Sequence, residues 1–186
     1  MKLSRKYQSV ALCLVMAWFA AFQVIAQVNI DQTQGSVGFA GEHAGMEFSG
    51  VFERWQATML LPTESAQASE AFINAEFDLS SATTGDATYD ETLPEGDWFD
   101  VDNHPKGRFV SDRVSPQGND YLVEGQLTLR GKTHPISFTL VSEGSRLSAS
   151  FNVDRIAYAI GLDSDPEAEW VSRNIALSLD IPNVAN

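Results

Sequence analysis

Cysteine is almost absent from this chain, since Cys13 is the only one among 186 residues. It lies in an apolar run near the amino terminus rather than in the body of the chain. Disulfide bonds, thiol catalysis and thiolate metal sites are therefore excluded from everything that follows this run. A domain without disulfides must rely on its hydrophobic core for stability.

Histidine and basic residues are also scarce. His43, His104 and His134 are the only histidines, and none lies at an i, i+2 or i, i+4 spacing from another. Because that spacing would bring two ligands onto one ion, no metal site is predicted. Lys and Arg number 12 against 25 Asp and Glu, which gives a formal net charge of −13. So acidic a surface repels nucleic acid and anionic membranes, and no nucleic-acid partner is expected.

Sequence motifs of the common enzyme classes are missing too. The chain has no serine nucleophile elbow, no phosphate-binding glycine loop and no nucleotide fingerprint. The acidic run at residues 163–169 lacks the central glycine of an EF-hand calcium loop and is interpreted as an exposed turn. No catalytic residue and no cofactor are predicted, although these absences leave an enzymatic role open.

The amino terminus has the pattern of a secretory signal peptide. Three basic residues lie among the first six, residues 10–24 are almost wholly apolar, and residues 24–26 are compact enough for cleavage. The apolar run is short for a membrane span, so a retained anchor is the less favoured interpretation. We expect residues 1–26 to be removed, residues 27–186 to form one domain, and the protein to be periplasmic.

The rest of the chain alternates between apolar and polar residues with the period of a β-strand. The clearest case is residues 121–141, two alternating runs around Gly131, which gives the backbone freedom that a short hairpin turn needs. Only residues 80–105 lack the alternation, and short helical turns are expected there. About eight strands separated by turns predict an all-β fold, a single eight-stranded antiparallel barrel or sandwich. A barrel of eight strands can hold one small ligand.

One phase of these strands supplies the expected interior. It is apolar and rich in aromatic residues, but the sequence does not separate a filled barrel from a hollow one with a lipid-binding cavity. Val51 shares the phase of Trp55 within residues 50–61, so the two are expected on the same face. The residues predicted to line the interior are Val37, Phe39, Trp55, Phe77, Leu127, Leu129, Ile136, Phe138, Phe151, Ile175 and Leu177.

Two arginines interrupt the inward phase of the last two strands. Arg155 continues the phase of residues 147–153, and Arg173 interrupts that of residues 171–181. A buried unpaired charge is costly, so each must reach solvent, a carboxylate or a ligand head group. Because both flank residues 156–169, they are expected at the same end of the fold. They either form rim salt bridges or turn outward, or they make a polar mouth above an apolar cavity.

Short motifs in a fixed order resemble the YceI-like family of exported, lipocalin-like barrels. Each motif is weak alone, but the ordered set is strong and covers nearly all of residues 28–181. Members often have glycine where this chain has Ala159, before the Ile-Gly pair. The motifs are Val37-x-Phe39 with His43 and Gly45, Gly50-x-Phe52, Tyr89-Asp90 with Leu93, residues 96–101 before His104-Pro105, the hairpin at 125–133, Asp154-Arg155 with Ile160-Gly161, and Glu169-Trp170-Val171-Ser172.

The resemblance implies an eight-stranded antiparallel barrel whose long apolar tunnel binds polyisoprenoid or similar amphiphilic chains. Residues 169–172 are similar to the subgroup found beside, or fused to, membrane b-type haem cytochromes, which implies an isoprenoid quinone as ligand. Taken with the residues, this predicts a periplasmic carrier or sequestering protein for an isoprenoid lipid or isoprenoid quinone, as a monomer or homodimer. Two alternatives stay open. One is an enzyme acting on a small or lipid substrate inside the barrel, with His43 as base; the other is a non-catalytic module that docks on a membrane b-type cytochrome.

Overall fold

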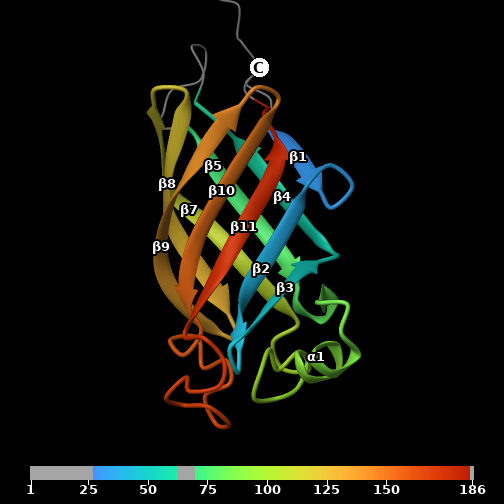
Figure 1. The fold of residues 1–186 in the computed structure, drawn as a ribbon. Helices are drawn as coiled ribbons and strands as arrows, with labels where there is room; N and C mark the ends of the chain where they lie inside the picture. The colour runs from blue at the N-terminus through green and yellow to red at the C-terminus, as the bar shows by residue number, and fades with distance from the viewer. Residues whose placement is uncertain (1–26, 63–69, 185–186) are drawn as a thin grey trace, which may run out of the picture.

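The computed structural model describes residues 27–62 and 70–184, which form one antiparallel sheet curled around an apolar interior (Figure 1). The signal peptide predicted at residues 1–26 lies outside the described residues. Eleven described strands make up the sheet, in the order β1-β4-β5-β7-β8-β9-β10-β11-β2-β3-β6. The predicted all-β class, a curled antiparallel sheet, is confirmed.

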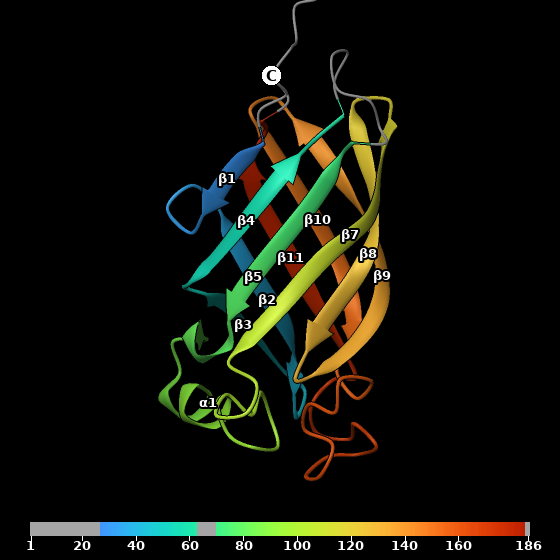
Figure 2. The same cartoon turned by 180° about the vertical axis from the view of Figure 1, so that it is seen from behind.

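From β7 to β11 the strands follow chain order around the sheet, and few helical turns interrupt the chain (Figure 2). The 3-10 helix η1 (Leu79–Ser81) and the helix α1 (Ala87–Thr92) fall in or beside the segment where helical turns were predicted. No helix in the described part of the chain is long and apolar enough to cross a membrane. The strands are β1 (Val28–Asp31), β2 (Ser36–His43), β3 (Met46–Phe52), β4 (Trp55–Leu60), β5 (Phe72–Asp78), β6 (Ala82–Thr83), β7 (Lys106–Gln117), β8 (Asp120–Leu129), β9 (Lys132–Glu143), β10 (Arg146–Asp154) and β11 (Asn174–Pro182).

The number of strands exceeds the eight predicted, because β1 and β6 were not foreseen and residues 50–61 form two strands. The chain bends at Glu53 and Arg54, whose backbone groups bond to Ser81 and Asp78. Before the bend β3 pairs with β2 and β6, and after it β4 pairs with β1 and β5. The bend changes which phase faces inward. Val51 is therefore 42% exposed, and its predicted place on the face of Trp55 is wrong.

Strands β8 and β9 form the hairpin predicted at residues 121–141. Leu129 pairs with Lys132 around Arg130 and Gly131, which both have positive φ, at 47° and 69°. Two such residues make the turn whose twist matches that of the flanking strands. Buried residues alternate along β8 with partly buried ones and the exposed Glu124, and Val123 is fully buried.

The joint between β9 and β10 is short. β10 pairs with β11 over nine residue pairs but with β9 over only three, at Arg146, Leu147 and Ser148. Within the described chain, residues 132–140 have no strand partner on that side. Pro135 lies in this stretch, as expected of a residue that lacks a backbone N–H. Side chains close this seam between the two strands, as the aromatic contacts below show.

One aromatic pair bridges the seam between β9 and β10, and a second joins β9 to the connection that follows β10. The rings of Phe138 and Phe151 stack with centroids 4.5 Å apart. The ring of His134 packs edge-on against Tyr158, with centroids 4.9 Å apart, and its Nε2 lies 3.0 Å from the carbonyl oxygen of Ala157. The wall is thus held there by side chains rather than by a backbone ladder.

Two connections lie together at one end of the sheet, the lower end in Figure 1. They are α1 with residues 93–105, and residues 155–173 after β10. Asp97 joins them, because its carboxylate accepts hydrogen bonds from the backbone N–H groups of Asp163 and Ser164 and from the Ser164 hydroxyl. This end holds the site described next.

Candidate functional site

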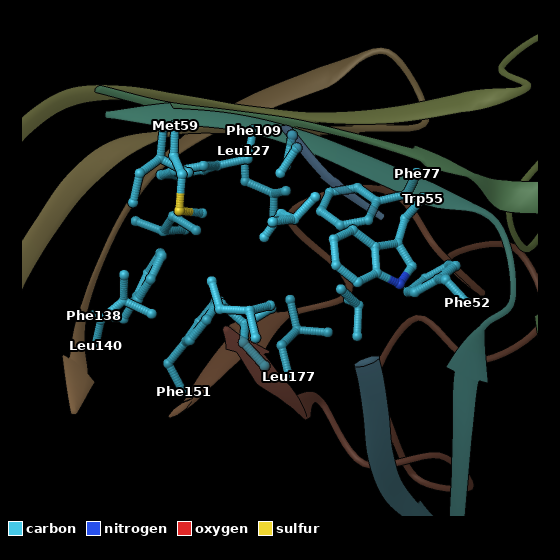
Figure 3. A pocket seen from close by; sticks show the side chains of 18 of the residues that line it. Phe52, Trp55, Met59, Phe77, Phe109, Leu127, Phe138, Leu140, Phe151 and Leu177 are labelled. Atoms are coloured by element: carbon cyan, nitrogen blue, oxygen red, sulfur yellow. The ribbon is translucent and has the colours of Figure 1, made fainter. Parts of the chain in front are cut away.

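The curled sheet encloses an apolar cavity of about 80 Å³ (Figure 3). Figure 3 shows side chains from opposite walls pointing toward one another, with Trp55 and Phe77 at one end and Phe138 and Leu140 toward the other. Walls of this kind disfavour a charged ligand and suit a hydrocarbon chain. The lining residues are Ile30, Val37, Phe52, Trp55, Ala57, Met59, Ile73, Ala75, Phe77, Phe109, Leu127, Leu129, Ile136, Phe138, Leu140, Phe151, Leu177, Leu179 and Ile181.

A second cavity, of about 70 Å³, continues the first toward the end that carries α1. Phe52, Leu129 and Leu177 line both cavities. These three side chains belong to the wall that the two cavities share.

A third cavity, of about 160 Å³, adjoins the second, and it alone of the three carries several polar groups. Four residues line both the second and the third cavity: Phe48, Leu93, Trp98 and Val171. The rest of its wall consists of His43, Thr84, Thr88, Tyr89 and Thr92. The three cavities therefore lie next to one another in a row, apolar along the sheet and more polar where α1 packs against the end of β2.

The His43 and Tyr89 side chains form the polar centre of the third cavity. His43 Nδ1 lies 2.9 Å from the Tyr89 hydroxyl oxygen, and the rings meet edge-on with centroids 5.6 Å apart. His43 is the last residue of β2 and forms a bridge with Val171. Tyr89 belongs to α1. The end of the sheet, the helix and the long 155–173 connection thus meet at this point.

Local hydrogen bonds hold α1 in place. The Asp86 carboxylate accepts from the backbone N–H groups of Thr88 and Tyr89, which caps the helix. The Asp90 carboxylate accepts from the Thr83 hydroxyl and from the backbone N–H and hydroxyl of Thr84. These bonds, that from Thr83 first, lower the pKa of Asp90, so an anion stands behind the Thr84 wall of the third cavity.

All eleven residues predicted to line the interior border the first or the second cavity. Phe39 and Ile175 border the second cavity and not the first. That any of these side chains contacts a ligand stays a prediction. The nine that border the first cavity are Val37, Trp55, Phe77, Leu127, Leu129, Ile136, Phe138, Phe151 and Leu177.

Comparison with known proteins adds the family. The model of the YceI-like domain matches residues 28–182, which is nearly all of the described chain. The chain belongs to the YceI-like family. A UPF0312 protein of Pseudomonas savastanoi pv. phaseolicola is 34% identical over 131 residues, which cover 68% of this chain and 67% of that protein. Protein YceI of Shigella flexneri is 26% identical over 130 residues, 67% of each chain.

Solved structures of this fold agree with the curled sheet. BcnA of Burkholderia cenocepacia is similar with a TM-score of 0.74 and 21% identity, over 83% of this chain and 99% of that one. A polyisoprenoid binding domain from Saccharophagus degradans, implicated in plant cell wall breakdown, is similar with a TM-score of 0.62 and 14% identity, over 88% and 100%. At these identities the likeness shows the fold alone.

Arg155, for which the sequence left open a rim salt bridge, an outward turn or a polar mouth, is buried in this YceI-like chain, with 2% of its side chain exposed. Its Nη2 lies 2.5 Å from Oδ2 of Asp165, and Trp98 lies under the guanidinium at 5.9 Å. The guanidinium thus holds residues 155–173 together. It donates to the backbone carbonyls of Ile160, Gly161, Asp165, Val171 and Ser172.

Arg173 makes an ion pair of another kind. Its side chain is 56% exposed, and its Nε lies 2.9 Å from Oδ2 of Asp154. Arg155 borders the second cavity, whereas Arg173 borders none of the cavities described above. Neither arginine can turn to a ligand head group without leaving its carboxylate.

Sequence reasoning missed the His43–Tyr89 pair. The sequence suggested His43 as a possible base and Tyr89 only as part of a family motif. The two residues are 46 positions apart in the chain, one on a strand and the other on a helix. No local spacing joins them. The only available signal was their common membership of the ordered family motifs. In residues 27–62 and 70–184, no three His, Asp or Glu side chains gather as metal ligands would.

Proposed function

We propose that this protein binds the hydrocarbon chain of an isoprenoid lipid inside its curled sheet and carries it in soluble form. The observation that carries the proposal is the row of three adjoining cavities, apolar along the sheet and polar at one end. Each CH₂ group withdrawn from water stabilises such a complex by about 0.8 kcal/mol. The Saccharophagus degradans neighbour, a polyisoprenoid binding domain, supports an isoprenoid as the class of ligand.

The cavities are small beside a long isoprenoid chain, so binding requires the lining side chains to move apart. Met59 lines the first cavity, and methionine adapts to irregular shapes more readily than branched side chains do. The seam between β9 and β10 has only three residue pairs to restrain it. Both features favour an interior that widens around its ligand.

We further propose a binding rather than a catalytic role, in the periplasm after removal of residues 1–26, as a monomer or homodimer and without a separate cofactor. A membrane b-type cytochrome is the proposed partner that supplies or receives the ligand. Two exposed apolar side chains near the third cavity support a docking surface there. Trp170 is 62% exposed and Met46 63% exposed, and the Trp170 carbonyl accepts the N–H of Ala44 beside Met46.

Native mass spectrometry and lipid extraction of the purified protein test the proposal. We expect an isoprenoid chain to leave the protein with the extracted lipid and to bind again when it is added back. Protein that is always empty and binds no added prenyl chain would contradict the proposal.

A matched pair of variants ties the binding to the interior. Ala57 is buried and lines the first cavity, whereas Ala176 lies on the phase of β11 opposite to Leu177. We expect Ala57→Phe to reduce the bound lipid about tenfold and Ala176→Phe to leave it unchanged. Filling a packed interior costs about 1–3 kcal/mol of stability, so thermal unfolding of both variants is measured alongside. Equal lipid content in folded Ala57→Phe would place the ligand elsewhere.

A further inference from the structure

Trp170 is held by its backbone while its side chain stays in solvent. The backbone N–H donates to the carboxylate of Asp165, and the carbonyl accepts the N–H of Ala44 at 2.7 Å. Asp165 is itself fixed by the buried Arg155. The side chain is nevertheless 62% exposed, although tryptophan is highly buried on average. A partner would therefore find this side chain already placed, with only its rotamer left to order.

Met46 extends this apolar surface to the rim of the third cavity. It follows the tight turn at Ala44 and Gly45 and pairs with His43, so the Met46 and His43 side chains share one face of the sheet. His43 lines the third cavity, whereas Met46, at the start of β3, is 63% exposed. Methionine adapts to partners of different shape, and tryptophan is enriched where binding energy concentrates. Met46 and Trp170 form the apolar centre of the surface.

Three exposed carboxylates lie beside this apolar centre. Glu42 and Glu47 are directly paired between β2 and β3, and Glu169 precedes Trp170 in the chain. None of the three takes part in an ion pair within the described part of the chain. Like charges directly opposite each other on a sheet destabilise it. The fold therefore keeps a repulsion here that a cation of a partner would relieve.

Basic residues are missing from the segments around this surface. Residues 36–53, 79–105 and 156–172 contain no Lys and no Arg. The basic residues that flank these segments are each paired with a carboxylate; they are Arg54, Lys106, Arg155 and Arg173. Arg130, from the turn between β8 and β9, donates to the carbonyl of Gly96. Such a surface repels anionic lipid and nucleic acid and attracts a basic protein face.

We infer that Met46, Trp170 and the three glutamates form the docking surface for a protein whose contact face has an apolar centre ringed by Lys or Arg. The inference rests on the proposed function, because a partner seated here would cover the rim of the third cavity, where it could take or deliver the ligand. Opposite charges steer the encounter, and burial of the two apolar side chains holds the complex together.

A short amphipathic helical peptide of leucine and lysine is the probe, because it presents an apolar stripe between ammonium groups. One control peptide has glutamate in place of lysine, and the other has serine in place of leucine. Binding to the purified protein is measured by titration calorimetry at low and at physiological salt. We expect only the leucine–lysine peptide to bind, with an affinity that falls about fivefold or more as the salt concentration rises.

One pair of variants tests the apolar centre. Trp170→Ser removes the exposed ring, and Val141→Ser is its control, because Val141 is 37% exposed near the other end of β9 from the Gly131 turn. We expect Trp170→Ser to weaken peptide binding about tenfold or more and Val141→Ser to leave it unchanged. Thermal unfolding is measured alongside, and both variants should match wild type, since each side chain removed is exposed.

A second pair of variants tests the carboxylates at equal net charge. Glu42→Gln with Glu47→Gln neutralises the surface, and Glu124→Gln with Glu143→Gln neutralises two exposed positions on β8 and β9. We expect the first double variant to weaken peptide binding about threefold or more and the second to change it less than about twofold. The first should also be no less stable than wild type, because it removes the repulsion between opposed carboxylates.

The outcomes separate docking from ligand carriage. Equal losses from the two double variants, unchanged binding by Trp170→Ser, or equal binding of the leucine–glutamate peptide would overturn the docking inference and leave the carrier function intact. So would tighter binding of the protein to vesicles of neutral phospholipid than to the peptide, which would make this surface a membrane contact. Protein that holds no lipid on extraction and takes up no prenyl chain overturns the carrier function, and with it the role of docking in ligand transfer.

Discussion

Phe138 of β9 and Phe151 of β10 stack with their ring planes 9° apart, at the seam where the two strands share only three residue pairs. Elsewhere in the sheet, longer backbone ladders join neighbouring long strands; β10 and β11, for instance, share nine pairs. At the seam, the stacked rings and the contact of His134 with Tyr158 hold the wall together in place of a long ladder. The wall should therefore be sensitive to side chains here.

A double-mutant cycle at the seam measures this dependence. Phe138→Leu and Phe151→Leu each keep an apolar side chain but remove a ring. We expect a coupling free energy of about 0.5–1.5 kcal/mol between them in urea unfolding, the usual range for an aromatic pair. Strictly additive losses would mean that the stacked rings contribute nothing beyond their burial.

The two arginines after β10 and before β11 should differ sharply in their effect on stability. Arg155→Gln leaves the Asp165 carboxylate and several carbonyls buried without their donor, and we expect a loss of about 3–5 kcal/mol. Arg173→Gln breaks an exposed pair worth at most about 1 kcal/mol. Arg155→Lys should not restore stability, because an ammonium lacks the planar set of donors. Chemical denaturation of the three variants checks this, and equal losses at both positions would refute it.

Acid should destabilise the protein through Asp165. Burial of this carboxyl favours its neutral form, but the backbone N–H groups of Val171, Glu169 and Trp170, together with Arg155, outweigh burial and lower its pKa. Because the pKa is lower in the folded state, the stabilisation is present above the unfolded value of about 3.9 and is lost as pH falls through the folded value.

The free energy of unfolding, measured from pH 6 downward, should therefore decrease once the pH is lower than about 4. The fall should be shallower in Asp165→Asn than in wild type. Asp102→Asn, at an exposed position, controls for the loss of one negative charge. If the free energy of unfolding depends on pH in the same way in wild type and in Asp165→Asn, the Asp165 carboxylate does not cause the acid destabilisation.

Glycine 50 is required for packing and not for a turn. A Cβ on Gly50 would lie 2.3 Å from Cζ of Phe39 and 2.6 Å from the backbone oxygen of Thr83. We expect Gly50→Ala to cost about 1–3 kcal/mol, since the backbone oxygen cannot yield as a side chain can. Gly96→Ala is the control, because a Cβ there meets nothing within 4 Å, and its effect should stay within about 1 kcal/mol. Thermal unfolding compares the two variants.

The alternation of apolar residues was enough to predict the sheet and its inner face. The β8–β9 hairpin and its turn at Gly131 follow the predicted phases, because a strand with one buried face has its register set by that pattern. The same logic failed at Val51. The bend at Glu53 and Arg54 is held by contacts with Ser81 and Asp78, which no alternation within residues 50–61 reveals.

The polar parts of the site were harder to predict than its apolar walls. Arg155 was correctly singled out as an anomaly in an inward phase, but its partner Asp165 lies in an irregular segment without periodicity. The pairing of His43 with Tyr89 depends on how α1 packs against the end of β2. Such contacts are tertiary, and sequence spacing carries little information about them.

The short joint between β9 and β10 has a mechanical consequence. To widen the curled sheet between any other pair of long strands, a whole row of backbone hydrogen bonds would have to break. At this joint, residues 132–140 can separate from β10 at the cost of a few ring contacts, while the three pairs at Arg146, Leu147 and Ser148 act as a hinge. We therefore expect any widening of the interior to occur along this joint, where ligands of different thickness would be accommodated.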